Sequence, residues 1–125
     1  MCEEILVMKD IRFTGVVSMK GKIIFASHKW KMAPHLSTGE TESFLIKAAI
    51  RMGTREEFLD KLGGIEYSFT QYGIIKQFTI PLKPDNHMLL LVSADNNGKD
   101  GNNSDDFIFL LNSIRRIINK YYEVK

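Results

Sequence analysis

Apolar and polar residues follow a strand-like pattern in three stretches between residues 65 and 94, and two short turns separate the stretches. The turns fall at Tyr72-Gly73 and at residues 83–86, which read Lys-Pro-Asp-Asn. The last stretch is apolar at every position from Met88 to Val92, whereas a strand with one face in water would alternate. The pattern predicts an antiparallel meander whose last strand lies centrally in a sheet that is covered on both faces.

Two further strands are predicted upstream, at residues 10–18 and 22–28. The turn between them contains Gly21, which can adopt a positive φ. Alternation along the first of these strands places four of its residues on one face, namely Ile11, Phe13, Gly15 and Val17.

Helical spacing of apolar residues appears in the remaining segments. Ser37 and Glu40 have the spacing of a capping box, and the helix that follows is predicted to end at Gly53. A second capping box at residues 54–57 predicts a short helix that Gly63 and Gly64 terminate. Residues 2–9 predict a short first helix.

The last predicted helix begins after Ser104 and carries a broad apolar stripe. Ile108 and Phe109 lie off that stripe, so we expect them to form an exposed helix face that could contact another protein.

The predicted element order is α-β-β-α-β-β-β-α. This order predicts an α+β fold, with a single five-stranded antiparallel sheet flanked by helices on both faces. A length of 125 residues fits one domain over residues 1–125. Residues 95–106 contain no large apolar side chain, and we expect a mobile polar loop there.

Composition adds few constraints. The net charge of +2 does not favour nucleic acid as a partner. The single cysteine, Cys2, excludes an internal disulfide and fits a reducing compartment. No apolar run is long enough to span a membrane, and the first residues are acidic where a signal peptide is basic. We expect a cytoplasmic protein.

Motifs for catalysis, metal binding or cofactor binding are missing from the sequence. It contains neither a Gly-x-Ser-x-Gly elbow nor a phosphate-binding Gly-x-x-x-x-Gly-Lys-Ser/Thr loop. His28, His35 and His87 lack the spacing that directs two imidazoles at one metal. An EF-hand alignment of residues 96–107 places Gly98 and Phe107 where ligands are needed. We expect no catalytic residue, no metal and no cofactor, and hence no enzyme.

A cluster of cations and one aromatic residue lies in and after the first hairpin. It is a candidate partner surface and consists of Lys20, Lys22, Lys29, Trp30 and Lys31. Such a surface suits an anionic partner. The alternative is a solvated hairpin edge whose lysines prevent unwanted strand pairing.

Residues 13–27, which read FTGVVSMKGKIIFAS, resemble the opening hairpin of the roadblock/dynein light chain family. The helix with Ala48-Ala49 and the strands at 69–78 and 87–92 are similar in position to that family's later elements. Longin and profilin-like domains share the element order, and PAS domains come close. The resemblance implies a non-enzymatic dimerising scaffold or regulator, often of small Ras-like GTPases or motor complexes.

Two functional hypotheses follow. In the first, the protein is a cytoplasmic homodimeric scaffold whose copies pair through an edge strand that carries Ile65, Tyr67 and Phe69. A small GTPase or another protein would then be its partner. In the second, the protein is a PAS-like sensor that holds a small apolar ligand. Its candidate wall residues are Trp30, Met32, Phe44, Met52 and Met88.

Overall fold

The structure, a computed structural model, describes residues 1–29, 34–82, 87–96 and 104–121, without the side chains of residue 56 and residues 104–107. The helices are α1 (Cys2–Leu6), α2 (Thr38–Arg55), η1 (Glu56–Phe58), α3 (Leu59–Leu62) and α4 (Ser104–Tyr121). The strands are β1 (Ile11–Ser18), β2 (Ile23–His28), β3 (Ser68–Gln71), β4 (Ile75–Leu82) and β5 (Met88–Asp95). The predicted element order is confirmed. The polar loop predicted at 95–106 falls largely outside the described residues.

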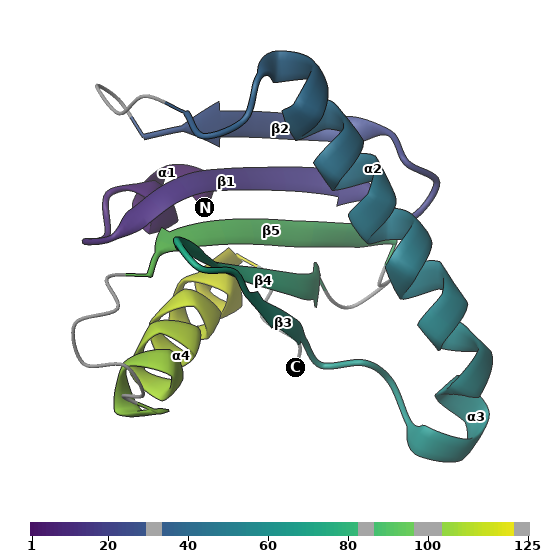
Figure 1. The fold of residues 1–125 in the computed structure, drawn as a ribbon. Coiled ribbons are helices and arrows are strands. Elements are labelled where there is room, and N and C mark those ends of the chain that lie inside the picture. The colour runs from purple at the N-terminus through teal and green to yellow at the C-terminus, as the bar shows by residue number, and fades with distance from the viewer. Residues whose placement is uncertain (30–33, 83–86, 97–103, 122–125) are drawn as a thin grey trace.

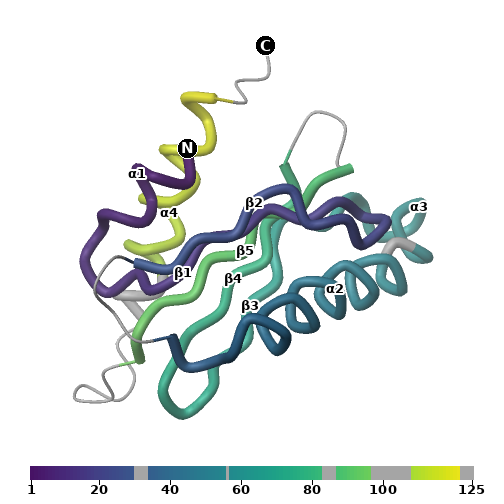
Figure 2. The backbone as a smooth tube through the Cα atoms, turned by 90° about the horizontal axis from the view of Figure 1, so that it is seen from above, coloured from purple at the N-terminus to yellow at the C-terminus, as the bar shows by residue number. Residues whose placement is uncertain are grey.

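The strands form one antiparallel sheet of five strands in the order β2-β1-β5-β4-β3 (Figure 1). Helix α2 crosses one face of the sheet, and α1 and α4 lie on the other face (Figure 2). The α+β prediction of a single sheet with helices on both faces is therefore confirmed.

Strand β5 lies between β1 and β4, as its continuous apolar sequence predicts. Leu89 and Leu91 pack in a cluster under α2, whereas Leu90 and Val92 pack in the cluster beneath α1 and α4. All four side chains are fully buried. Since successive side chains of a strand point to opposite faces, only cover on both sides can bury such a run.

The start of α2 follows its sequence signal. Ser37 Oγ accepts a hydrogen bond of 3.1 Å from the Glu40 N–H, and Glu40 Oε1 accepts one of 2.9 Å from the Ser37 N–H. The predicted end at Gly53 is wrong, because α2 continues to Arg55 and runs on through η1 into α3. Gly63 then ends α3 at a φ of +85°, which suits glycine.

A β-bulge changes the predicted face of β1. The pairing of β1 with β5 shifts register between Ile11 and Phe13, so Arg12 is an extra residue. Ile11 consequently packs with Ile5 in the cluster beneath α1 and α4, while Phe13 packs under α2. The prediction that Ile11 and Phe13 share a face is wrong.

Candidate functional site

One edge of the sheet is the short strand β3, which pairs on one side with β4. The Tyr72 N–H donates a 2.8 Å hydrogen bond to the Ile75 carbonyl. This bond shows which residue pairs of the β3–β4 hairpin are hydrogen-bonded, starting with Tyr72 and Ile75. Because hydrogen-bonded pairs alternate in an antiparallel ladder, Ser68 and Thr70 bond toward β4. Gln71 therefore directs its backbone N–H and C=O groups away from β4, toward the outer edge of the sheet.

The residues predicted for this edge occupy different environments. Strand β3 begins at Ser68, so of the three only Phe69 lies in it. Ile65 packs against the cluster under α2. Tyr67 lies below the Arg115 guanidinium, which is 5.0 Å from its ring centroid. Phe69 packs on Phe78 with ring centroids 5.0 Å apart, so its side chain belongs to the core.

The opposite edge of the sheet is β2. Its pairing with β1 shifts register between Val16 and Val17, and its Ile24 and Phe25 side chains are 47% and 40% exposed. A bulge twists a strand and interrupts a regular row of edge groups. The pairing of β3 with β4 has no such shift. Of the two edges of the sheet, β3 is therefore better suited to pair with a strand of another molecule.

The predicted cationic surface is only partly described, since Trp30 and Lys31 lie outside the described residues. Lys20 and Lys22 are exposed beside the turn after β1. Lys29 is half-buried, and its Nζ donates a 2.7 Å hydrogen bond to the Met8 carbonyl. The ammonium group of Lys29 thus has an internal partner.

The residues named for an exposed helix face, Ile108 and Phe109, are 51% and 71% exposed on α4. Their neighbours Leu111 and Ile114 are buried against the sheet. The start of α4 thus presents apolar surface on its outer side as well as its inner side.

Titratable groups form no cluster that resembles a catalytic or metal site in the part of the chain that the structure describes. No group of three His, Cys, Asp or Glu side chains there could hold a metal ion. Burial raises the pKa of the Cys2 thiol, which disfavours the nucleophilic thiolate. Burial, and secondarily the Arg12 charge, lower the pKa of His28. Within the described ranges no helix is long and apolar enough to cross a membrane.

Of the wall residues of the sensor hypothesis, the three that the structure describes do not enclose one cavity. Phe44 and Met52 pack in the cluster under α2, whereas Met88 packs on the other face of the sheet. Trp30 and Met32 lie outside the described residues. A cavity beside Phe44 has a volume of about 50 Å³, far below the several hundred Å³ of a typical ligand pocket.

Sequence reasoning missed a polar groove between α2 and the β3–β4 hairpin. Arg51 and Arg55, one turn apart on α2, line it from above, and Arg55 Nη1 donates a 2.9 Å hydrogen bond to Ser68 Oγ. The sheet below contributes polar side chains, including Thr70 and Gln77. The spacing of Lys47, Arg51 and Arg55 in the sequence was the available signal, but only the fold shows what the arginines face.

Comparison with known proteins places this architecture in a class. No protein-family model and no curated protein matches the sequence. Among solved structures, a roadblock/LC7 domain from Streptomyces avermitilis matches with a TM-score of 0.61 and 10% identity, over 94% of this chain and 93% of that one. The protein therefore has the fold of the roadblock/LC7 domain, as the sequence resemblance implies.

The particular structures that it resembles include the gliding protein MglB from Thermus thermophilus. The TM-score is 0.62 at 17% identity, over 75% of this chain and 67% of that one. A structure of MglB in a tetrameric arrangement matches with a TM-score of 0.63 at 16% identity and the same coverage. At these identities the likeness concerns the fold alone.

Proposed function

We propose that this protein is a non-enzymatic, cytoplasmic module that forms dimers by joining the β3 edges of two copies. The joined pair acts as a scaffold or regulator of a small Ras-like GTPase. The observation that carries the proposal is the regular edge of β3, where the backbone N–H and C=O groups of Gln71 point away from β4. Antiparallel pairing of two such edges would continue the sheet through both copies.

Two further points support this proposal. The fold is that of the roadblock/LC7 domain, and one of the similar structures shows MglB in a tetrameric arrangement. The resemblance of the opening hairpin to the roadblock family implies a regulatory partner of the Ras-like class.

The edge can be tested with a substitution that changes only one backbone donor. Gln71→Pro removes an N–H that points away from β4, so the hairpin ladder is kept. Gln71→Ala is the matched control because it truncates the same exposed side chain and keeps the N–H. Phe69 is unsuitable for this test because its ring packs in the core.

Light scattering over a dilution series measures the outcome. Wild type and Gln71→Ala should be dimers at micromolar concentration, and Gln71→Pro should be a folded monomer by circular dichroism and mass. A Gln71→Pro variant that remains fully dimeric would contradict association through β3.

The GTPase part of the proposal has its own test. Purified Ras-like GTPases from the same organism, loaded with GDP or with a non-hydrolysable GTP analogue, are titrated against the protein. Saturable binding that depends on the bound nucleotide supports the proposal. Equal and negligible binding of both forms to the confirmed dimer argues for another kind of partner.

A further inference from the structure

The face of the sheet under α2 changes character from its centre to the β3 edge. Over β1 and β5 it is apolar, with Phe13, Leu89 and Leu91 packed against the helix. Over β4 and β3 it is polar. There a groove of about 220 Å³ is lined by Ala48, Arg51, Met52, Arg55, Ser68, Thr70, Tyr72, Gln77 and Thr79. The apolar packing that holds α2 on the sheet therefore lies mainly over β1 and β5, and polar groups are left facing the groove.

The side of α2 toward this groove is strongly cationic. Lys47, Arg51 and Arg55 follow one another at intervals of four residues, and no acidic residue lies three or four positions from any of them. Like charges at this spacing oppose helix formation. The ion pairs in the described part of the chain use other cations, namely Arg12, Arg115 and Lys120. Lys47, Arg51 and Arg55 therefore have no carboxylate partner among the ion pairs of the described residues.

The two arginines present donors to the groove from above. Arg55 already donates to the Ser68 hydroxyl at 2.9 Å, which holds its side chain over β3. On the floor, buried Gln77 is satisfied inside the protein, because its Oε1 accepts from Ser93 and its Nε2 donates to the Phe78 carbonyl. The guanidinium groups are thus the charged groups left to bind a ligand.

We propose that this groove binds a small oxyanion, a phosphate or carboxylate group, on Arg51 and Arg55. A guanidinium group is planar and can donate two parallel hydrogen bonds to two oxygens of a carboxylate or of a phosphate. The hydroxyl groups of Ser68 and Thr70 lie in the same lining and supply neutral donors. A volume of 220 Å³ is below the roughly 300–1,000 Å³ of typical ligand pockets, and it suits an inorganic or two-carboxylate ion better than a nucleotide.

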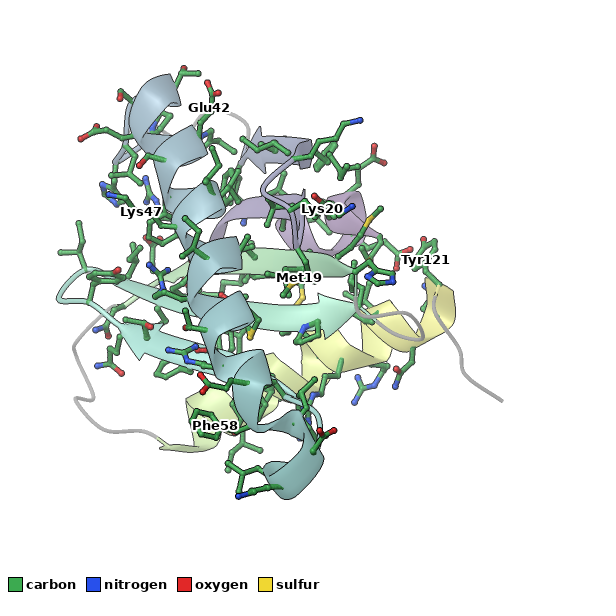
Figure 3. The ribbon with its side chains drawn as sticks, turned by 90° about the vertical axis from the view of Figure 1, so that its right-hand side faces the viewer. Met19, Lys20, Glu42, Lys47, Phe58 and Tyr121 are labelled. Atoms are coloured by element: carbon green, nitrogen blue, oxygen red, sulfur yellow. The ribbon has the colours of Figure 1, made fainter. Side chains whose placement is uncertain are left out.

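Figure 3 labels Lys47 on α2, and this residue provides the matched control. Lys47 is exposed and carries the same charge on the same helix, one turn before Arg51, but it does not line the groove. An anion held in the groove depends on Arg51 and Arg55 far more than on Lys47. A diffuse attraction to a cationic surface would depend on all three equally.

The test is a two-dimensional NMR titration with inorganic phosphate and, separately, with malonate, at constant pH and ionic strength. Resonances of Ser68, Thr70 and the Arg51 and Arg55 side chains should shift and saturate together. Arg51→Gln and Arg55→Gln should each weaken binding about tenfold or more, and Lys47→Gln by less than about threefold. Arg51→Lys keeps the charge but loses the paired N–H donors of the guanidinium group, and it should also weaken binding.

The relative affinity for the two anions identifies the chemical group that the groove binds. Tighter binding of phosphate assigns the groove to a phosphoryl group, and tighter binding of malonate assigns it to carboxylates. Shifts that never saturate, or an equal loss in Lys47→Gln, would overturn the proposal. One chain supplies every residue that lines the groove, so a monomeric Gln71→Pro variant should still bind phosphate saturably, and failure of the dimer proposal remains distinguishable. Circular dichroism confirms that each exposed arginine variant is folded.

Discussion

Arg55 and Ser68 join the last turn of α2 to the edge strand of the sheet through a 2.9 Å hydrogen bond from Nη1 to Oγ. The contact connects a helix that carries a cationic row with the strand that we propose for self-association. Antiparallel pairing of two β3 edges about a twofold axis puts both α2 helices on the same face of the joined sheet. Their cationic sides then face each other.

This arrangement makes the proposed dimer sensitive to salt in a definite direction. The rows of Lys47, Arg51 and Arg55 repel one another across the twofold axis, and salt screens the repulsion. We expect the dimer to become several-fold tighter between about 0.02 M and about 0.3 M sodium chloride, as measured by analytical ultracentrifugation. Lys47→Gln combined with Arg51→Gln should flatten this dependence. A dimer that weakens steadily as salt is added would contradict the arrangement in which the cationic rows of the two copies face each other.

Two glycine substitutions should change stability in opposite directions. A Cβ at Gly15 would lie 2.9 Å from Phe13 Cζ and 3.1 Å from Leu45 Cδ2, both in the cluster under α2. We expect Gly15→Ala to lower the free energy of unfolding by about 1–3 kcal/mol.

A Cβ at Gly53 would meet nothing within 4 Å, and Gly53 is inside α2. Gly53→Ala should therefore stabilise the protein by about 0.5–1 kcal/mol. Urea denaturation of both variants measures these changes, and a destabilised Gly53→Ala would indicate a contact that the structure lacks.

The sheet and its central strand could be predicted from sequence because their signals are redundant. An apolar run from Met88 to Val92 has few explanations other than burial on both faces, and the structure buries it so. The capping box at Ser37 and Glu40 is equally local, since both of its hydrogen bonds lie within four residues. Such features do not depend on the rest of the fold.

Other features depend on distant parts of the chain and were missed. The bulge at Arg12 is hidden because residues 11–14 alternate between apolar and polar as an unbroken strand would. Ile65 and Tyr67 continue the alternation of β3 in the sequence. In the structure, Ile65 packs against the cluster under α2 and Tyr67 contacts Arg115, and both residues precede the strand. The polar groove could not be predicted, because Arg55 and Ser68 come into contact only after α2 has crossed the sheet.

Two isoleucines on α4 provide a comparison of buried and exposed surface. Ile114 is fully buried against the sheet, whereas Ile108 is 51% exposed on the same helix. We expect Ile114→Ala to cost about 2–5 kcal/mol, because it removes buried apolar area and leaves a cavity. Ile108→Ala should change stability by less than about 1 kcal/mol. Chemical denaturation measures both values. Similar losses for the two variants would mean that Ile108 is covered in solution, and an oligomer would then be sought at that face.

His28 should make stability depend on pH between neutral and mildly acidic conditions. Burial, and secondarily the charge of Arg12, lower its pKa below 6.5, and its ring packs 4.9 Å from that of Phe13. Between the folded pKa and 6.5 the unfolded chain binds more protons than the folded one, so the free energy of unfolding falls as pH drops through this interval. His28→Gln should flatten the fall, and His35→Gln, on the exposed segment before α2, serves as the control. The measurement is urea denaturation at several pH values from about 7.5 to about 5.5, above the range where ordinary carboxylates titrate. If His28→Gln loses stability as steeply as the wild type, another group is responsible for the pH dependence.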